Sequence, residues 1–115
     1  MSTFDKDAIE QFRLSILKPV SQFCGTEITT HDEDGVDVSN VAVHIPGCDI
    51  DYMDVEVRDL PDNRGGYSGV EVSVGCGDPY AYEEIFSNRD TALAFIRERI
   101  AVIVKDAAES ETRGN

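Results

Sequence analysis

Two short segments of the chain alternate strictly between apolar and polar side chains. The apolar positions are Met53, Val55, Val57, Val70, Val72 and Val74. The polar positions between them are Asp54, Glu56, Arg58, Glu71 and Ser73. Because successive side chains of a strand point to opposite faces, this pattern predicts two half-buried strands, at about residues 50–58 and 69–75. Each strand would place one face in the core and the other in water.

Two further strands are expected before this pair, at residues 26–31 and 36–45. The turn between them contains Gly35, which tolerates positive φ. The second of these strands changes parity, because Val36 and Val38 point one way whereas Val41 and Val43 point the other. A β-bulge near residues 39–40 would reconcile the two halves.

Helical periodicity appears at both ends of the chain, over residues 4–18 and 90–108. We expect Pro19 to end the first helix and Asn88 or Asp90 to cap the second. Residues 80–86 are expected to form a short helical turn.

The predicted fold class is therefore α+β, in the order α-β-β-β-β-α. We expect an antiparallel meander of three to four strands with the N-terminal and C-terminal helices packed on one face. Residues 1–108 would form a single acidic domain, and residues 109–115 a flexible C-terminal tail.

The charge of the chain is strongly negative and unevenly distributed. The 115 residues include 23 Asp plus Glu but only 10 Lys plus Arg, for a formal net charge of -13. Residues 19–57 contain no Lys or Arg. Such a field disfavours direct binding to nucleic acid or to an anionic membrane, and it favours a basic protein surface or a cation. Solubility alone is the competing explanation.

We expect the partner-binding residues to be carboxylates on turns and on outward strand positions. These are Asp32, Glu33, Asp34, Asp37, Asp49, Asp51, Asp54 and Glu56. The loop predicted at residues 59–68 adds Arg64 and Tyr67, residue types that are enriched at binding hot spots.

No catalytic residue, cofactor or metal is expected. The acidic turn at residues 32–37 lacks the ligand positions of an EF-hand. His31 and His44 could join the cysteines in a zinc site, but the spacing resembles no standard zinc motif. Three widely spaced cysteines, Cys24, Cys48 and Cys76, favour reduced thiols and a cytoplasmic protein.

Neither a membrane span nor a secretory signal is visible. No apolar run approaches the roughly 20 residues that a spanning helix needs, and the N-terminus lacks a basic segment followed by an apolar one. Phe95 and Val102 lie off the core stripe of the last helix, either packed against residues 78–88 or in a dimer contact. The chain is thus expected to be a monomer or a homodimer.

In size, charge and expected architecture the chain resembles, as a class, the small acidic inhibitors that phages and mobile elements use against host defence complexes. We therefore expect a non-enzymatic inhibitor of the anti-CRISPR type that occupies a basic nucleic-acid-binding surface on a nuclease or defence complex. Immunity proteins that neutralise toxins share these features and are the first alternative. A phage structural or housekeeping domain, acidic only for solubility, is the second.

Overall fold

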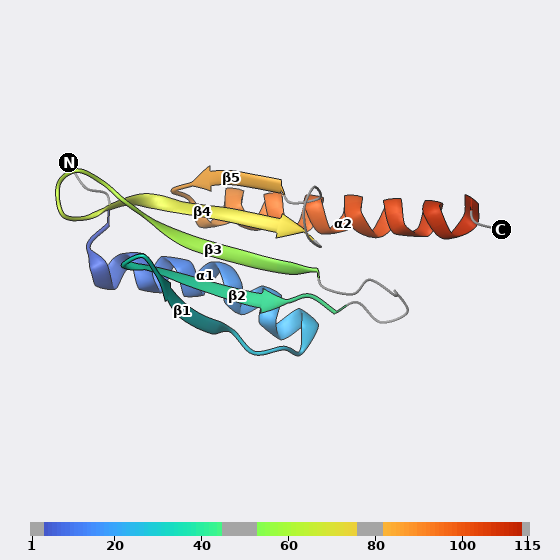
Figure 1. Cartoon of the computed structure of the whole chain (residues 1–115), viewed down its shortest axis with the longest axis horizontal. Coiled ribbons are helices and arrows are strands. Elements are labelled where there is room, and N and C mark those ends of the chain that lie inside the picture. Colours follow the sequence, from blue (N-terminus) through green and yellow to red (C-terminus); the bar gives the residue numbers. More distant parts are fainter. Residues whose placement is uncertain (1–3, 45–52, 76–81, 114–115) are drawn as a thin grey trace.

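The computed structural model describes residues 4–44, 53–75 and 82–113. Within these ranges, two helices flank five strands (Figure 1). The elements are α1 (Lys6–Cys24), β1 (Thr29–Glu33), β2 (Val36–Ala42), β3 (Asp54–Pro61), β4 (Tyr67–Gly75), β5 (Tyr82–Phe86) and α2 (Arg89–Arg113). This arrangement confirms the predicted α+β class.

The five strands form one antiparallel sheet in the order β1-β2-β3-β4-β5. Both helices lie behind the sheet in Figure 1, where α1 packs on β2, β3 and β4, and α2 on β4 and β5. The valines at alternate positions of the central strands point toward the helices and are buried, as predicted. In the part of the chain that the structure describes, no helix covers the opposite face.

β5 corrects the expected helical turn at residues 80–86. Its residues pair with β4 from Val70↔Phe86 to Val74↔Tyr82. Aromatic and Ile side chains favour a strand, and β4 offers a free edge. Gly69 makes the close approach possible, because a Cβ at this position would lie 2.4 Å from the carbonyl oxygen of Phe86.

Pro19 does not end the first helix, contrary to prediction. Helix α1 continues to Cys24 and ends at Gly25, whose φ of 69° provides a left-handed cap. Proline has no N–H, so the carbonyl of Ser15 loses its partner within the helix. Arg89 compensates by donating to this carbonyl at 3.3 Å.

The prediction of a β-bulge in β2 is also wrong. The register of β2 with β3 runs without a shift from Val38↔Arg58 to Ala42↔Asp54. Ser39 therefore points toward the helices, on the same face as Asp37 and Val41, and Val38 is buried on the opposite face. The parity change in the sequence reflects a buried serine rather than an extra residue.

A buried arginine explains why Ser39 is tolerated there. Arg13 of α1 donates to Ser39 Oγ at 2.8 Å and to Asp59 Oδ2 at 2.6 Å. Thr30 of β1 shares a hydrogen bond of 2.8 Å with the same serine. All the side-chain atoms of this network except Thr30 are almost inaccessible, and Asp59 Oδ1 has no hydrogen-bond partner in the described part of the chain.

The hairpin between β3 and β4 is tighter than expected. Strand pairing reaches Pro61↔Tyr67, so residues 62–66 alone form the connection instead of residues 59–68. Asp62 Oδ1 accepts from the backbone N–H groups of Arg64 and Gly66. Tyr67 pairs with Phe4 through two backbone hydrogen bonds, which ties the hairpin to the segment before α1.

Asn88 caps α2, as predicted, by accepting from the backbone N–H groups of Asp90 and Thr91. The helix continues to Arg113, past the predicted end at residue 108, and extends beyond the sheet in Figure 1. Phe95 packs on Phe86 of β5, with ring centroids 5.1 Å apart. Within the described ranges, no helix is both long and apolar enough to span a membrane.

Candidate functional site

The face of the sheet opposite the helices, here called the outer face, is the candidate site. Its side chains fall into cross-strand rows because the registers of the five strands run without a shift up to Leu60/Pro61, near the end of β3. One row contains His31, Val38, Arg58, Glu71 and Ile85. The next contains Thr29, Asn40, Glu56, Ser73 and Glu83.

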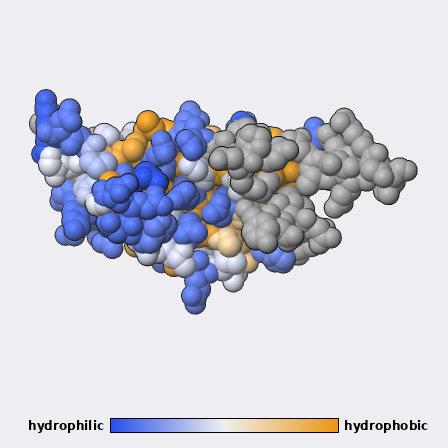
Figure 2. Space-filling model, in the orientation of Figure 1, coloured by the Kyte–Doolittle hydropathy of each residue, from blue (hydrophilic) through white to orange (hydrophobic). Residues whose placement is uncertain are grey.

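Carboxylates outnumber cations on the outer face. They are Glu33, Asp54, Glu56, Glu71 and Glu83, against Arg58 and the titratable His31, among the strand residues that the structure describes. Figure 2, in the orientation of Figure 1, shows hydrophilic side chains gathered over this side of the molecule. The excess of negative charge is therefore a property of one face as well as of the composition.

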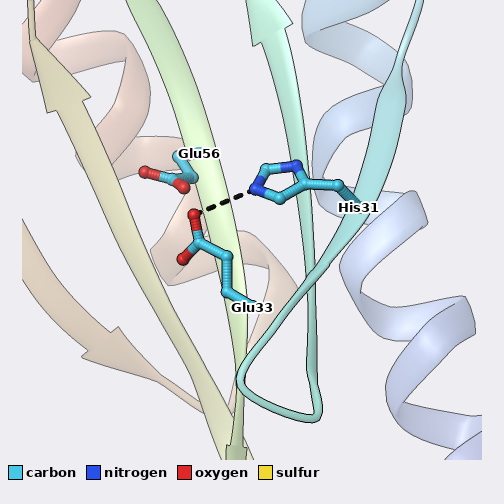
Figure 3. A group of neighbouring side chains, drawn as sticks. All are labelled: His31, Glu33 and Glu56. Atoms are coloured by element: carbon cyan, nitrogen blue, oxygen red, sulfur yellow. Dashed lines mark hydrogen bonds and ion pairs between the residues drawn. The ribbon is translucent and has the colours of Figure 1, made fainter.

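Glu33 is the centre of a polar network on the outer face (Figure 3). Its Oε1 accepts from His31 Nε2 at 3.0 Å, and its Oε2 pairs with Arg58. The pair with Arg58 crosses over β2, because β2 lies between β1 and β3. The hydrogen bond from His31, helped by the charge of Arg58, holds the pKa of Glu33 below its ordinary value.

Glu56 lies beside this network but takes no hydrogen bond or ion pair among the described residues. Burial raises the pKa of its carboxyl, and the negative charges of Glu33 and Asp54 raise it further. Burial alone raises the pKa of Asp54. The two side chains are two residues apart on β3, about 7 Å along the strand. The site is therefore under electrostatic strain that Arg58 relieves only in part.

The structure brings together three of the predicted partner-binding residues. Glu33, Asp54 and Glu56 share the outer face. Asp32 and Asp37 are cross-strand neighbours on the helix side of the sheet. This is the face to which Thr30 and Ser39 point. Asp37 was expected to point outward, and the uninterrupted register of β2 reverses it.

The other predicted residues are dispersed. Asp34 lies in the β1–β2 turn with a φ of 56°, next to Gly35 at 84°. Arg64 is exposed at the hairpin tip. Tyr67 is half-buried against the core and is not part of the tip. Asp49 and Asp51 lie outside the described residues.

Sequence reasoning did not assign His31, Arg58 or Glu83 to the site. Each is predictable in principle from a strand register, since one row aligns His31 with Arg58 and the other aligns Glu56 with Glu83. Their cross-strand alignment could not be predicted while β2 was expected to contain a bulge. The same holds for Glu83, because residues 80–86 were expected to form a helical turn.

The helix side carries an apolar groove of about 480 Å³ between α1 and α2. Phe23, which is 72% exposed, lies at its border with Pro19, Ile100 and Val104. Arg97 is the only charged residue in the described lining. The groove lacks the several convergent polar groups that position a substrate for chemistry.

No protein family model, curated protein or solved structure matches the chain. The functional argument consequently depends on the geometry of the outer face.

Proposed function

We propose that the protein is a small non-enzymatic binding protein whose outer face docks on a basic surface of another protein. The preferred target class is a nucleic-acid-binding protein, such as a nuclease or a defence complex, whose phosphate-binding surface would be covered. The protein would then act as an inhibitor of nucleic-acid binding.

The observation that carries the proposal is the group of carboxylates on the outer face, which neither described helix covers. Like charges on neighbouring strand positions reduce the stability of a sheet. Among the described residues Glu56 forms no ion pair, and Glu33 and Asp54 raise its pKa whereas the charge of Arg58 lowers it. A basic partner would supply the missing counter-charge and would turn a cost in the free protein into attraction in the complex.

The sheet also provides a shape suited to such a partner. The side chains of Asp54, Glu56 and Glu83 project from strands held in register by a buried core, so the backbone positions that carry them are fixed before binding. Preorganised charges lose little conformational entropy on association. Ile85, 64% exposed on the same face, adds an apolar contact next to Glu71.

The test compares two variants that lose the same number of charges. The outer-face variant carries Asp54→Asn, Glu56→Gln, Glu71→Gln and Glu83→Gln. The control carries Asp7→Asn, Glu10→Gln, Asp90→Asn and Glu98→Gln, which are exposed positions on the two helices. Each protein is immobilised and used to capture partners from a lysate, and the affinity of the captured protein is then measured at increasing salt.

We expect the wild type and the control to capture the same basic protein, and the outer-face variant to lose it. Affinity should fall as salt rises, less steeply for the outer-face variant. The captured protein should bind nucleic acid, and adding the wild type should displace that nucleic acid. Equal capture by both variants would contradict the proposal, and displacement of no nucleic acid would contradict its inhibitory part.

A further inference from the structure

Three side chains of the outer face bring metal-binding atoms to one point. His31, Glu33 and Glu56 each offer one ligand atom, and the three atoms lie within 4.8 Å of one another. In Figure 3, His31 and Glu33 extend from β1 and Glu56 from β3, and the three side chains converge above the sheet. These strands are separated by β2, so the cluster exists only in the folded protein.

We propose that His31, Glu33 and Glu56 bind one divalent transition-metal ion of the Zn²⁺ class, with water in the remaining position. Zinc accepts imidazole nitrogen and carboxylate oxygen at about 2.0–2.2 Å, usually in tetrahedral geometry. Ligand atoms of such a tetrahedron lie about 3.3 Å apart. The separation of 3.0 Å between His31 Nε2 and Glu33 Oε1 is already close to this value.

Arg58 would orient one ligand of this site without binding the metal itself. It pairs with Oε2 of Glu33, which fixes the carboxylate and leaves Oε1 directed at His31. Carboxylates that bind metals are commonly oriented by such hydrogen bonds. Val38, between His31 and Arg58 in the same row, is fully buried and provides an apolar floor.

The charge and the ligand types select the ion. With Asp54 included, the carboxylates and Arg58 carry a formal charge of −2, which a divalent cation balances. The carboxylate of Glu56 has no hydrogen bond or ion pair within the described ranges, so a metal would displace no partner from it. Imidazole favours Zn²⁺ and its neighbours in the transition series over Mg²⁺ or Ca²⁺, which prefer oxygen ligands alone.

The experiment titrates Zn²⁺ into the purified chain by calorimetry, after chelator treatment and removal of any histidine tag. We expect one ion per chain and no comparable heat with Mg²⁺. His31→Gln and Glu56→Gln should each weaken binding by at least about 10-fold. His44→Gln is the matched control, because His44 is exposed and lies just beyond β2, and it should bind like the wild type.

Two outcomes would overturn the site: no stoichiometric binding, or binding that survives both His31→Gln and Glu56→Gln. The second would assign the ion to other ligands, with the cysteine thiols as the obvious group. Circular dichroism of each variant verifies that the fold is intact. The measurement uses the chain without a partner, so its result is independent of the proposed inhibition.

Discussion

Two arginine–carboxylate pairs lie on opposite faces of the same sheet, and they differ mainly in their access to water. Arg13 and Asp59 are enclosed between α1 and the sheet, with side chains 2% and 3% exposed. Arg58 and Glu33 lie on the outer face, with side chains 37% exposed each. Both pairs join elements that are distant in sequence.

The comparison distinguishes an ion pair that stabilises the fold from an ion pair that can exchange its partners. Breaking a buried pair leaves an uncompensated charge in a medium of low dielectric constant, whereas an exposed pair is screened and exchanges readily with solvent. Arg13 therefore has a structural role. Arg58 and its neighbours can exchange partners, which is the property that a binding surface requires.

The largest predicted effect follows from Arg13→Met. This change leaves Asp59 buried without its cation and removes the donor to Ser39. We expect a loss of about 3–5 kcal/mol in the free energy of unfolding, measured by urea denaturation.

The double variant Arg13→Met with Asp59→Leu is the control for that loss. Replacing both partners of a buried pair by apolar residues is often neutral, so the double variant should recover most of the stability. If it is as unstable as the single variant, the pair contributes through packing rather than through its charges.

A moderate effect is expected from pH, and both faces contribute to it. Burial raises the pKa of Asp59 despite the hydrogen bond from Arg13, and it is the main cause of the raised pKa of Asp54 and Glu56. In the pH range above their ordinary values of 3.8 and 4.5, the folded state therefore binds more protons than the unfolded state. Lowering the pH from 7 to 5 should increase stability. Urea midpoints at each pH, in the presence of a chelator, measure it.

Glu33 acts in the opposite direction, but only at lower pH. Its pKa is lowered, so its contribution is lost as the pH falls below the ordinary value of 4.5. Glu56→Gln should flatten the increase between pH 7 and 5. A stability that decreases steadily over this range would show that the raised pKa values do not control the profile.

A smaller effect on stability is expected from Arg58→Gln. Exposed ion pairs contribute little to folding, and glutamine keeps part of the aliphatic stem beside Val38. The urea midpoint should change far less than for Arg13→Met. A loss as large as that of Arg13→Met would mean that the outer-face network is also structural.

The smallest effect is expected from Glu56→Gln at pH 7 without metal. Removing one of several neighbouring carboxylates should slightly increase stability, within the range of about 0.5 kcal/mol that is usual for surface changes. Ser73→Ala, in the same row, is a neutral control for the measurement. Destabilisation by Glu56→Gln alone would indicate a stabilising contact of its carboxylate.

The fold was predictable wherever burial produces a clean period in the sequence. The alternation of Val55 with Glu56, and of Val72 with Glu71, identified two strands and their outward positions. β5 was missed because an edge strand of five residues has too little alternation to distinguish it from a turn, and its pairing depends on Gly69.

The site was only partly predictable, for reasons that concern tertiary structure. Arg13 lies on the apolar, buried side of α1, where a charged side chain is not expected, and its partner Asp59 lies 46 residues away. Glu33 and Glu56 were expected to bind a partner, but their convergence with His31 depends on three strands in register. Asp37 was assigned to the wrong face because Ser39 was interpreted as a bulge.

The two edges of the sheet bear directly on how the protein behaves in concentrated solution. β1 and β5 are five residues each, and their side chains include Asp32 and Glu33 on one edge and Glu83 and Glu84 on the other. If the sheets of two copies paired edge to edge, these carboxylates would lie close together and repel one another. The protein thus discourages its own polymerisation at neutral pH, and mild acid or high salt should weaken that protection and promote precipitation.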